Sequence, residues 1–200
     1  RGLGDVYKRQ ELFTGNNLMI MGVLARTITV RRMLRNWLVV YLGNFAGAVL
    51  VAALCVSGHV FSAFGGKLAA SVIAIAQTKA GLTFGDAFVR GILCNFLVCI
   101  AVWMANAAKT AGGKIAAVFF PIMAFVVAGF EHSVANMYYL AAGIFTAGQT
   151  GAAAEGLTWG RALIGNLLPV TLGNLVGGGL LVGVSAWYLY LKKGRNSVNS

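Results

Sequence analysis

The chain has 200 residues, of which 58% are hydrophobic and only 10% are charged. Soluble domains carry about 25% charged residues, so this composition excludes an ordinary soluble protein. The mean hydropathy of +0.78, with 27 Gly and 2 Pro, also excludes a disordered or collagen-like chain. The formal net charge of +11 would suggest nucleic acid in a soluble protein. Here the charges lie between long apolar segments, so we expect an integral α-helical membrane protein with a lipid bilayer, not nucleic acid, as its partner.

The chain begins with a polar segment, residues 1–10, which a short apolar segment follows. The polar segment lacks the apolar core of a signal peptide. We interpret 1–10 as a leader that does not belong to the protein, and a native cytoplasmic tail is the alternative. Residues 12–25 are apolar, but a helix of this length covers only about half to two thirds of a hydrocarbon core of about 30 Å. We therefore predict a half-helix over 12–25.

Further apolar segments predict the remaining membrane crossings, because about 20 helical residues cross a hydrocarbon core. The expected helices are 36–58, 87–108, 162–191, and a broken helix formed by 115–130 and 133–150, followed by a tail over 192–200. The break falls at Glu131 and His132. Irregular backbone at membrane depth is tolerated only against protein or a watery cavity. The break therefore indicates a permeation pathway.

Basic residues are concentrated in alternate connections between the predicted helices. Residues 26–35 contain four arginines and no acid, Lys109 and Lys114 flank a later connection, and three basic residues follow the last helix. Cytoplasmic loops are enriched in Lys and Arg, so we expect these regions and the C-terminus to face the cytoplasm. Lys67 and Lys79 are predicted to lie in a loop on the opposite side.

Motifs for catalysis or for cofactor binding are absent from the sequence. It contains no phosphate-binding glycine loop, no zinc-protease motif and no nucleophile elbow. The three cysteines, Cys55, Cys94 and Cys99, lie in apolar segments without the spacing of metal ligands. We therefore expect no enzyme, no cofactor, no metal site and no disulfide framework.

Two short patterns occur twice in the chain. Residues 36–44 and 166–174 share asparagines at both ends, a central Val, and Leu-Gly before the last Asn, at an offset of 130. Residues 11–16 and 131–136 share a Glu and an Asn five positions apart, at an offset of 120. Three membrane crossings separate the copies, so equivalent elements have opposite orientations, as in an inverted-topology repeat. The unit is three helices with a broken middle one, and the chain then lacks the first helix and half of the second.

Polar groups gather where the broken helices restart, near Thr14 and Ser133. Helix N-termini carry partial positive charge and free N–H groups, and two of them facing each other attract an anion. Thr14 adds a hydroxyl, and His132 adds an imidazole that titrates near neutral pH. A carboxylate at membrane depth costs about 3 kcal/mol, so we expect Glu131 to be buried and to accept N–H groups of the loop, in either a structural or a functional role.

Other candidates have two interpretations each. The asparagines inside the helices, Asn44, Asn95, Asn166 and Asn174, either line a pore or form hydrogen bonds between helices. Three apolar residues either form constrictions beside the polar centre or pack in the core; they are Leu12, Phe13 and Phe125.

Three segments closely resemble motifs of the formate/nitrite transporter family. They are ELFTGN at 11–16, GFEHSVANM at 129–137 and NLLPVTLGNLVGG at 166–178. The resemblance runs from residue 11 to about 191. It implies an aquaporin-like protomer of six helices, a homopentamer with one pore per protomer, and transport of formate, nitrite, hydrosulfide or related small anions. The family has a first helix and a first half-helix before ELFTGN, where this chain has residues 1–10.

The resemblance also implies roles for individual residues. The family's central histidine corresponds to His132, its threonine in the first broken helix to Thr14, and its lysine between the third and fourth helices to Lys79. The glutamate and asparagine beside the histidine correspond to Glu131 and Asn136. Phe125 and Leu12 fall where the family places constrictions, a position that the resemblance does not give to Phe13.

The sequence thus predicts a channel domain over 11–191 in the bacterial cytoplasmic membrane, with formate as its substrate. Nitrite or hydrosulfide channels, a proton-coupled secondary transporter, a neutral-solute channel and a non-transporting scaffold are the alternatives. A neutral acid crosses an apolar constriction far more easily than a bare anion. We expect Lys79 and the helix dipoles to concentrate the anion. Protonation at the centre, with His132 as donor or as the polarising partner of Thr14, would make the flux depend on pH.

Overall fold

The computed structural model describes residues 12–192, and all regular structure within this range is helical. The predicted leader 1–10, Glu11 and the basic residues beyond Lys192 lie outside the described residues. The helices in chain order are α2 (Phe13–Asn16), η1 (Asn17–Met19), α3 (Ile20–Leu24), α4 (Val30–Ser57), η2 (Val60–Ser62), η3 (Phe64–Gly66), α5 (Lys67–Ala80), α6 (Phe84–Ala107), α7 (Ala111–Val127), α8 (Ser133–Thr150), η4 (Arg161–Leu167), α9 (Leu168–Asn174), η5 (Leu175–Val184) and η6 (Trp187–Lys192).

Threonine caps set the start of three helices. The side chains of Thr29, Thr83 and Thr110 accept the backbone N–H three residues ahead, at 3.3, 3.1 and 3.1 Å. These caps start α4, α6 and α7 three to six residues before the predicted positions. The segment 26–35 is therefore only partly a connection, because its last residues, from 30 onward, belong to α4.

The placement of Lys67 and Lys79 in a loop was wrong. Both residues lie on α5, a helix of 14 residues that the sequence analysis did not predict. Its alanines and isoleucine, Ala69, Ile73, Ala76 and Ala80, recur at helical spacing and are buried. The helix is too short to cross a hydrocarbon core, and it carries Lys79 to the centre of the protein.

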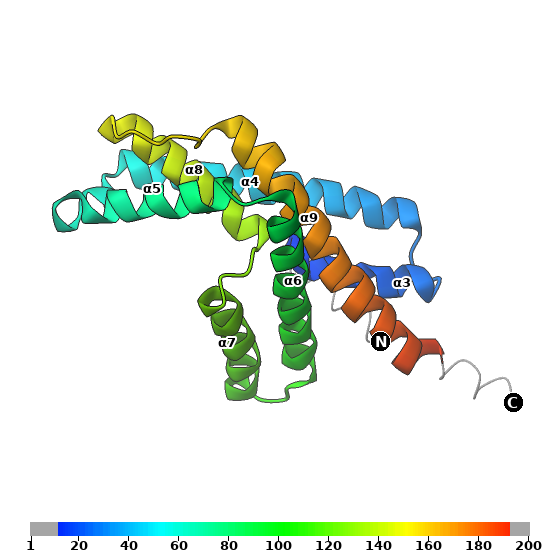
Figure 1. The fold of residues 1–200 in the computed structure, drawn as a ribbon. Coiled ribbons are helices and arrows are strands. Elements are labelled where there is room, and N and C mark those ends of the chain that lie inside the picture. Colours follow the sequence, from blue (N-terminus) through cyan, green and yellow to red (C-terminus); the bar gives the residue numbers. More distant parts are fainter. Residues whose placement is uncertain (1–11, 193–200) are drawn as a thin grey trace, which may run out of the picture.

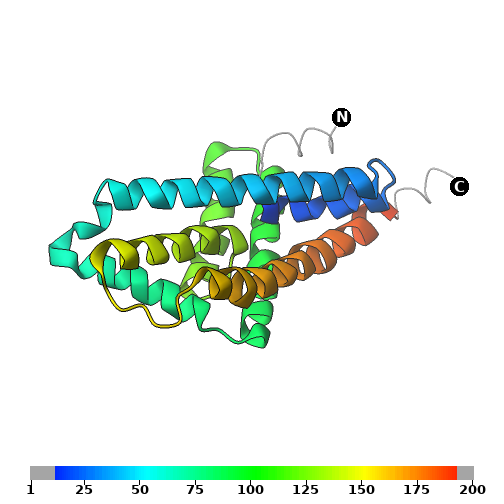
Figure 2. The ribbon, with the colours of Figure 1, turned by 90° about the horizontal axis from the view of Figure 1, so that it is seen from above.

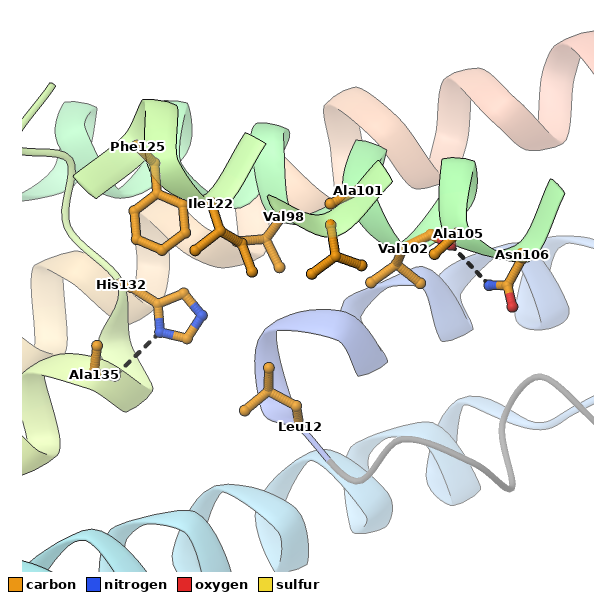
Figure 3. A pocket seen from close by; sticks show the side chains of 11 residues that line it. Leu12, Val98, Ala101, Val102, Ala105, Asn106, Ile122, Phe125, His132 and Ala135 are labelled. Carbon is orange, nitrogen blue, oxygen red and sulfur yellow. Dashed lines mark hydrogen bonds between the residues drawn. The ribbon is translucent and has the colours of Figure 1, made fainter. Parts of the chain in front are cut away.

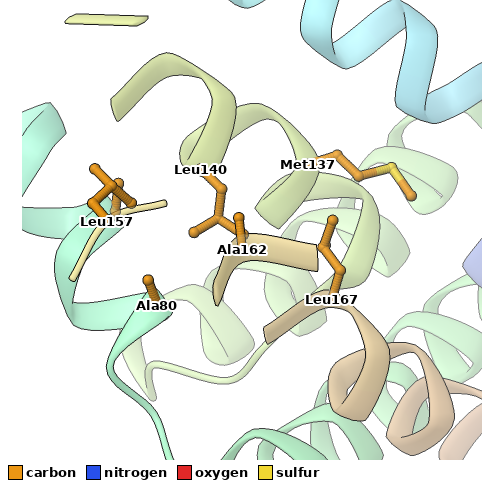
Figure 4. Close-up of a cluster of buried hydrophobic side chains, with 7 residues drawn as sticks. Ala80, Met137, Leu140, Leu157, Ala162 and Leu167 are labelled. Atoms are coloured by element: carbon orange, nitrogen blue, oxygen red, sulfur yellow. The ribbon is translucent and has the colours of Figure 1, made fainter. Parts of the chain in front are cut away.

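Within residues 12–192, three helices are long and apolar enough to span a membrane: Val30–Ser57, Phe84–Ala107 and Arg161–Leu191. α4, α5 and α8 lie side by side, and the last helix crosses α6 (Figures 1 and 2). Residues of α5, of α8, of the first turns of the last helix and of the connection before it form a buried cluster around Met137 and Leu140 (Figure 4). The α3–α4 connection and the end of the last helix lie at the same end of the molecule, whereas the α6–α7 connection projects from its side (Figure 1).

Small residues allow α6 and the last helix to cross at backbone contact. A Cβ atom on Gly91 would lie 2.8 Å from the carbonyl oxygen of Val170, and one on Gly177 would collide with the carbonyl oxygen of Ile92. Close helix crossings in membranes use such residues because packing, not the hydrophobic effect, drives association there. This crossing fixes α6 against the helix that carries Asn166 and Asn174.

We predict that Gly177→Ala destabilises the protein by about 1–3 kcal/mol, because the added methyl group forces two backbones apart. Thermal unfolding of the detergent-solubilised protein measures the effect. Gly148→Ala in α8 is the control, since a Cβ there has no atom within 4 Å and alanine favours a helix. Equal melting temperatures for Gly177→Ala and Gly148→Ala would contradict the prediction that close packing at this crossing stabilises the protein.

Candidate functional site

The two restarting half-helices meet at Thr14 and His132. The hydroxyl oxygen of Thr14 lies 3.0 Å from Nε2 of His132, and Thr14 has no exposed surface. His132 is the N-cap of α8, where its Nδ1 lies 3.1 Å from the backbone nitrogen of Ala135. A backbone N–H can only donate, so Nδ1 accepts, and the neutral ring then carries its proton on Nε2. Nε2–H therefore donates to Thr14, and the proton of the Thr14 hydroxyl stays available for another acceptor.

The ring of Phe125 stacks on the ring of His132, with centroids 5.8 Å apart and planes inclined by 16° (Figure 3). This stack separates two hollows of about 340 and 520 Å³, which share Phe125, His132 and Ala135 in their walls. The stack thus lies on the border between the two hollows, beside the break at Glu131-His132.

The two hollows differ in chemistry. The smaller, which we call the apolar hollow, is lined by Leu12, Val98, Val102, Val118 and Ile122 besides the stack, with Asn106 at its rim (Figure 3). The larger, which we call the polar hollow, has a wall that contains five polar or charged side chains besides Glu131 and His132: Thr78, Lys79, Arg90, Asn136 and Tyr139. The charged side chains Lys79, Arg90 and Glu131 therefore lie on one side of the stack only.

Glu131 is 3% exposed and is held by side chains, not by loop N–H groups as expected. Its carboxylate accepts from Nζ of Lys79 at 2.9 Å, from the amide of Asn136, and from the amide of Asn166 at 3.4 Å. The Asn166 amide also donates to the carbonyl of Lys79 at 2.9 Å. The expectation of burial is confirmed, and the loop instead contributes the backbone N–H of Glu131, which donates to the carbonyl of Arg90 at 3.3 Å.

The predicted repeat is present in the hydrogen bonds. The first N–H of each half-helix donates to an asparagine: Phe13 to Asn44 at 3.1 Å, and Ser133 to Asn174 at 2.9 Å. The amide of Asn16 donates to Asn36 at 2.9 Å, as that of Asn136 does to Asn166 at 2.8 Å. These pairs occupy equivalent positions in the two copies. The side-chain oxygens of Tyr41 and Thr171, a further equivalent pair, lie 3.0 Å apart, which places the pseudo-twofold axis between them.

The asparagines join elements and do not line either hollow, apart from Asn136 and Asn106. Asn174 donates to the carbonyls of Gly91 and Glu131 at 2.8 and 3.0 Å, and Asn95 donates to the carbonyls of Asn174 and Thr14 at 2.6 and 3.3 Å. Of the two interpretations, the geometry favours hydrogen bonding between helices for Asn44, Asn95, Asn166 and Asn174.

The structure separates the three constriction candidates. Leu12 and Phe125 line the apolar hollow. Phe13 is 4% exposed and packs edge-to-face against Trp37 and Tyr41, so its position favours core packing. Arg90, which lines the polar hollow, was not among the predicted site residues, although a lone cation directly before the charge-free run 91–108 was a signal for it.

The fold and site define a class: a helical membrane protein in which two short helices begin beside the Thr14–His132 contact, next to two hollows. The sequence pattern of the formate/nitrite transporter family matches residues 6–188. The chain belongs to the formate/nitrite transporter family.

Relatives and solved structures agree with this assignment. The chain is 41% identical to a probable formate transporter of Methanothermobacter thermautotrophicus and to the formate channel FocA of Haemophilus influenzae, over 92% and 90% of this chain and 69% and 67% of those proteins. It is similar to a pentameric formate channel with formate bound, with TM-score 0.75, 38% identity, and coverage of 82% of this chain and 69% of that one. An ion channel of the same family gives TM-score 0.78, 36% identity, and coverage of 90% and 69%. These relatives are transporters and channels rather than enzymes.

We predict that Lys79→Met destabilises the protein by about 3 kcal/mol, because it leaves the buried carboxylate of Glu131 without its cation. The double variant Lys79→Met with Glu131→Gln removes both charges, and we expect it to recover most of the loss. Denaturation of the solubilised protein measures both. A double variant no more stable than Lys79→Met would contradict the pairing.

Proposed function

We propose that this protein conducts small monovalent anions of weak acids across the cytoplasmic membrane, with formate as the physiological substrate. The observation that carries the proposal is the Phe125–His132 stack between a polar and an apolar hollow. The formate channels and the formate transporter among the relatives support the choice of substrate. In this proposal residues 11–191 form the channel domain and the C-terminus lies in the cytoplasm, where basic residues are favoured.

The difference between the hollows suggests how the anion crosses. The charged side chains, with the unpaired cation Arg90 among them, line the polar hollow, whereas the apolar hollow has no charged side chain beyond the stack. Moving a bare anion into such surroundings is costly, and moving the neutral acid is not. The species that passes the stack is then the protonated acid, so flux at a fixed total concentration rises as the pH falls.

His132 acts in this proposal as the partner that polarises Thr14. Nδ1 accepts the N–H of Ala135, so protonating the ring would break the cap of α8 and oppose two donors at 3.1 Å. A neutral ring donates from Nε2 to Thr14, which leaves the Thr14 hydroxyl to donate to an oxygen of the passing acid. The sequence left two roles open for His132. The contacts support polarisation of Thr14 over proton donation by an imidazolium.

We predict that Thr14→Val reduces formate uptake at least about tenfold, because it removes a buried hydrogen-bond partner of His132 and the hydroxyl donor. Uptake into proteoliposomes that contain the full-length protein, followed from pH 5 to pH 8, measures the effect. Thr14→Ser keeps the hydroxyl and is expected to retain most of the flux. In all active variants the flux should fall as the pH rises. His132→Phe should reduce the flux, because it removes the partner that polarises Thr14, and an unchanged rate and pH profile would exclude the site.

We also propose that the protein forms a homopentamer. Only 17% of the apolar window of α4 is buried within the chain, and Leu38, Val39, Leu42, Leu50 and Leu54 expose about half of their surface or more. An apolar face of this size fits lipid or further copies of the chain, and one similar structure is of a pentameric formate channel. Native mass spectrometry of the detergent-solubilised full-length protein should therefore show five copies, and a monomer at all concentrations would contradict the proposal.

A further inference from the structure

Arg90 occupies an unusual place for a cation. It lies in the second turn of α6, inside a helix long and apolar enough to cross a membrane, and its side chain lines the polar hollow. Ionisable residues inside membrane helices are costly, and they face a water-filled cavity or the bundle interior when they occur. The hollow is therefore the environment that makes Arg90 tolerable at this depth.

The charges around the polar hollow leave Arg90 uncompensated. Lys79 pairs with Glu131 at 2.9 Å, and the two side chains are only 15% and 4% exposed, so that their charges cancel. This is the one ion pair within residues 12–192. Asp86, one helical turn before Arg90, accepts instead from the hydroxyl of Thr83 at 2.7 Å. The free positive charge of the hollow is thus that of Arg90, not that of Lys79.

The guanidinium group also has a shape preference. It presents N–H groups in a planar fork that matches two oxygens of a carboxylate or a nitrite ion, whereas an ammonium group acts as a point charge. Hydrosulfide offers one acceptor atom and gains nothing from the fork. A single Arg90 could therefore both collect anions and favour planar oxyanions among them.

We infer that Arg90 binds the anion in the polar hollow before it reaches the stack, and that it favours two-oxygen anions such as formate over hydrosulfide. The inference rests on the proposed function and adds a specificity-determining residue to it. The anion then moves from Arg90 toward the rim that Phe125, His132 and Ala135 share with the apolar hollow. Arg90 does not take part in the protonation itself.

The test compares Arg90→Gln, Arg90→Lys and the control Lys67→Gln in proteoliposomes of the full-length protein, with formate and hydrosulfide as separate substrates. Lys67 is exposed at the start of α5, lies outside both hollows, and its replacement removes the same charge. We expect Arg90→Gln to raise the half-saturating concentration of both anions about tenfold. Arg90→Lys should raise that of formate about threefold to fivefold and leave that of hydrosulfide within about twofold. Lys67→Gln should change neither.

The outcomes separate this inference from the proposed function. A protein that conducts neither anion before substitution refutes the proposed function. If the unsubstituted protein conducts and Arg90→Gln leaves half-saturation unchanged, or lowers only the maximal flux, capture by Arg90 is excluded. Equal shifts for both anions in Arg90→Lys exclude the preference for two oxygens. Because Arg90 is exposed to the hollow, its variants should elute from size exclusion as the unsubstituted protein does, which confirms that they are folded.

Discussion

A helix broken at membrane depth leaves backbone N–H groups that water cannot reach, and here asparagine side chains satisfy them. Asn174 accepts the N–H of Ser133 and donates to the carbonyls of Glu131 and Gly91. In hydrocarbon an unsatisfied backbone group costs several kcal/mol, so the break exists only because Asn174 closes it. This arrangement determines the position of His132 and the burial of Glu131. It also leaves the space that the two hollows occupy.

The buried carboxylate then determines the electrostatics of the site. The carboxylate of Glu131 accepts hydrogen bonds from Lys79 and from the amides of Asn136 and Asn166. An uncompensated carboxylate here would repel the anions that the channel is proposed to carry. Because Lys79 is already paired with Glu131, the recruitment of anions in the proposed function falls to Arg90.

The sequence was most informative at polar and charged residues, whose burial in a membrane costs much free energy. Glu131-His132 in an apolar run revealed the break, and the repeated asparagines revealed the repeat, whose equivalent hydrogen bonds the structure confirms.

The sequence was least informative about elements that have only a weak sequence signal. α5 is short and rich in alanine, so neither its length nor its hydropathy distinguished it from a connection. The threonine caps at Thr29, Thr83 and Thr110 were readable signals, but a search for charge-free runs does not find them. Contacts between distant segments, such as Arg90 beside Glu131, depend on the crossing of α6 and the last helix and leave no local pattern.

The helix α5 lies between the two copies of the repeat and has no equivalent within residues 12–192. The hydrogen bonds of the asparagines are therefore nearly the same in the two copies. The helix that carries Lys79 occurs only once in the described residues and breaks this symmetry. A pore built from two matched halves would saturate equally from either face. In the proposed pore, this insertion places Lys79 on one side of the Phe125–His132 stack only, so the two faces differ in charge. A passive pore cannot move solute against its gradient, whatever its asymmetry, so the difference can alter only the concentration at which each face saturates. Import and export of the same anion would then run at unequal speeds under equal and opposite gradients.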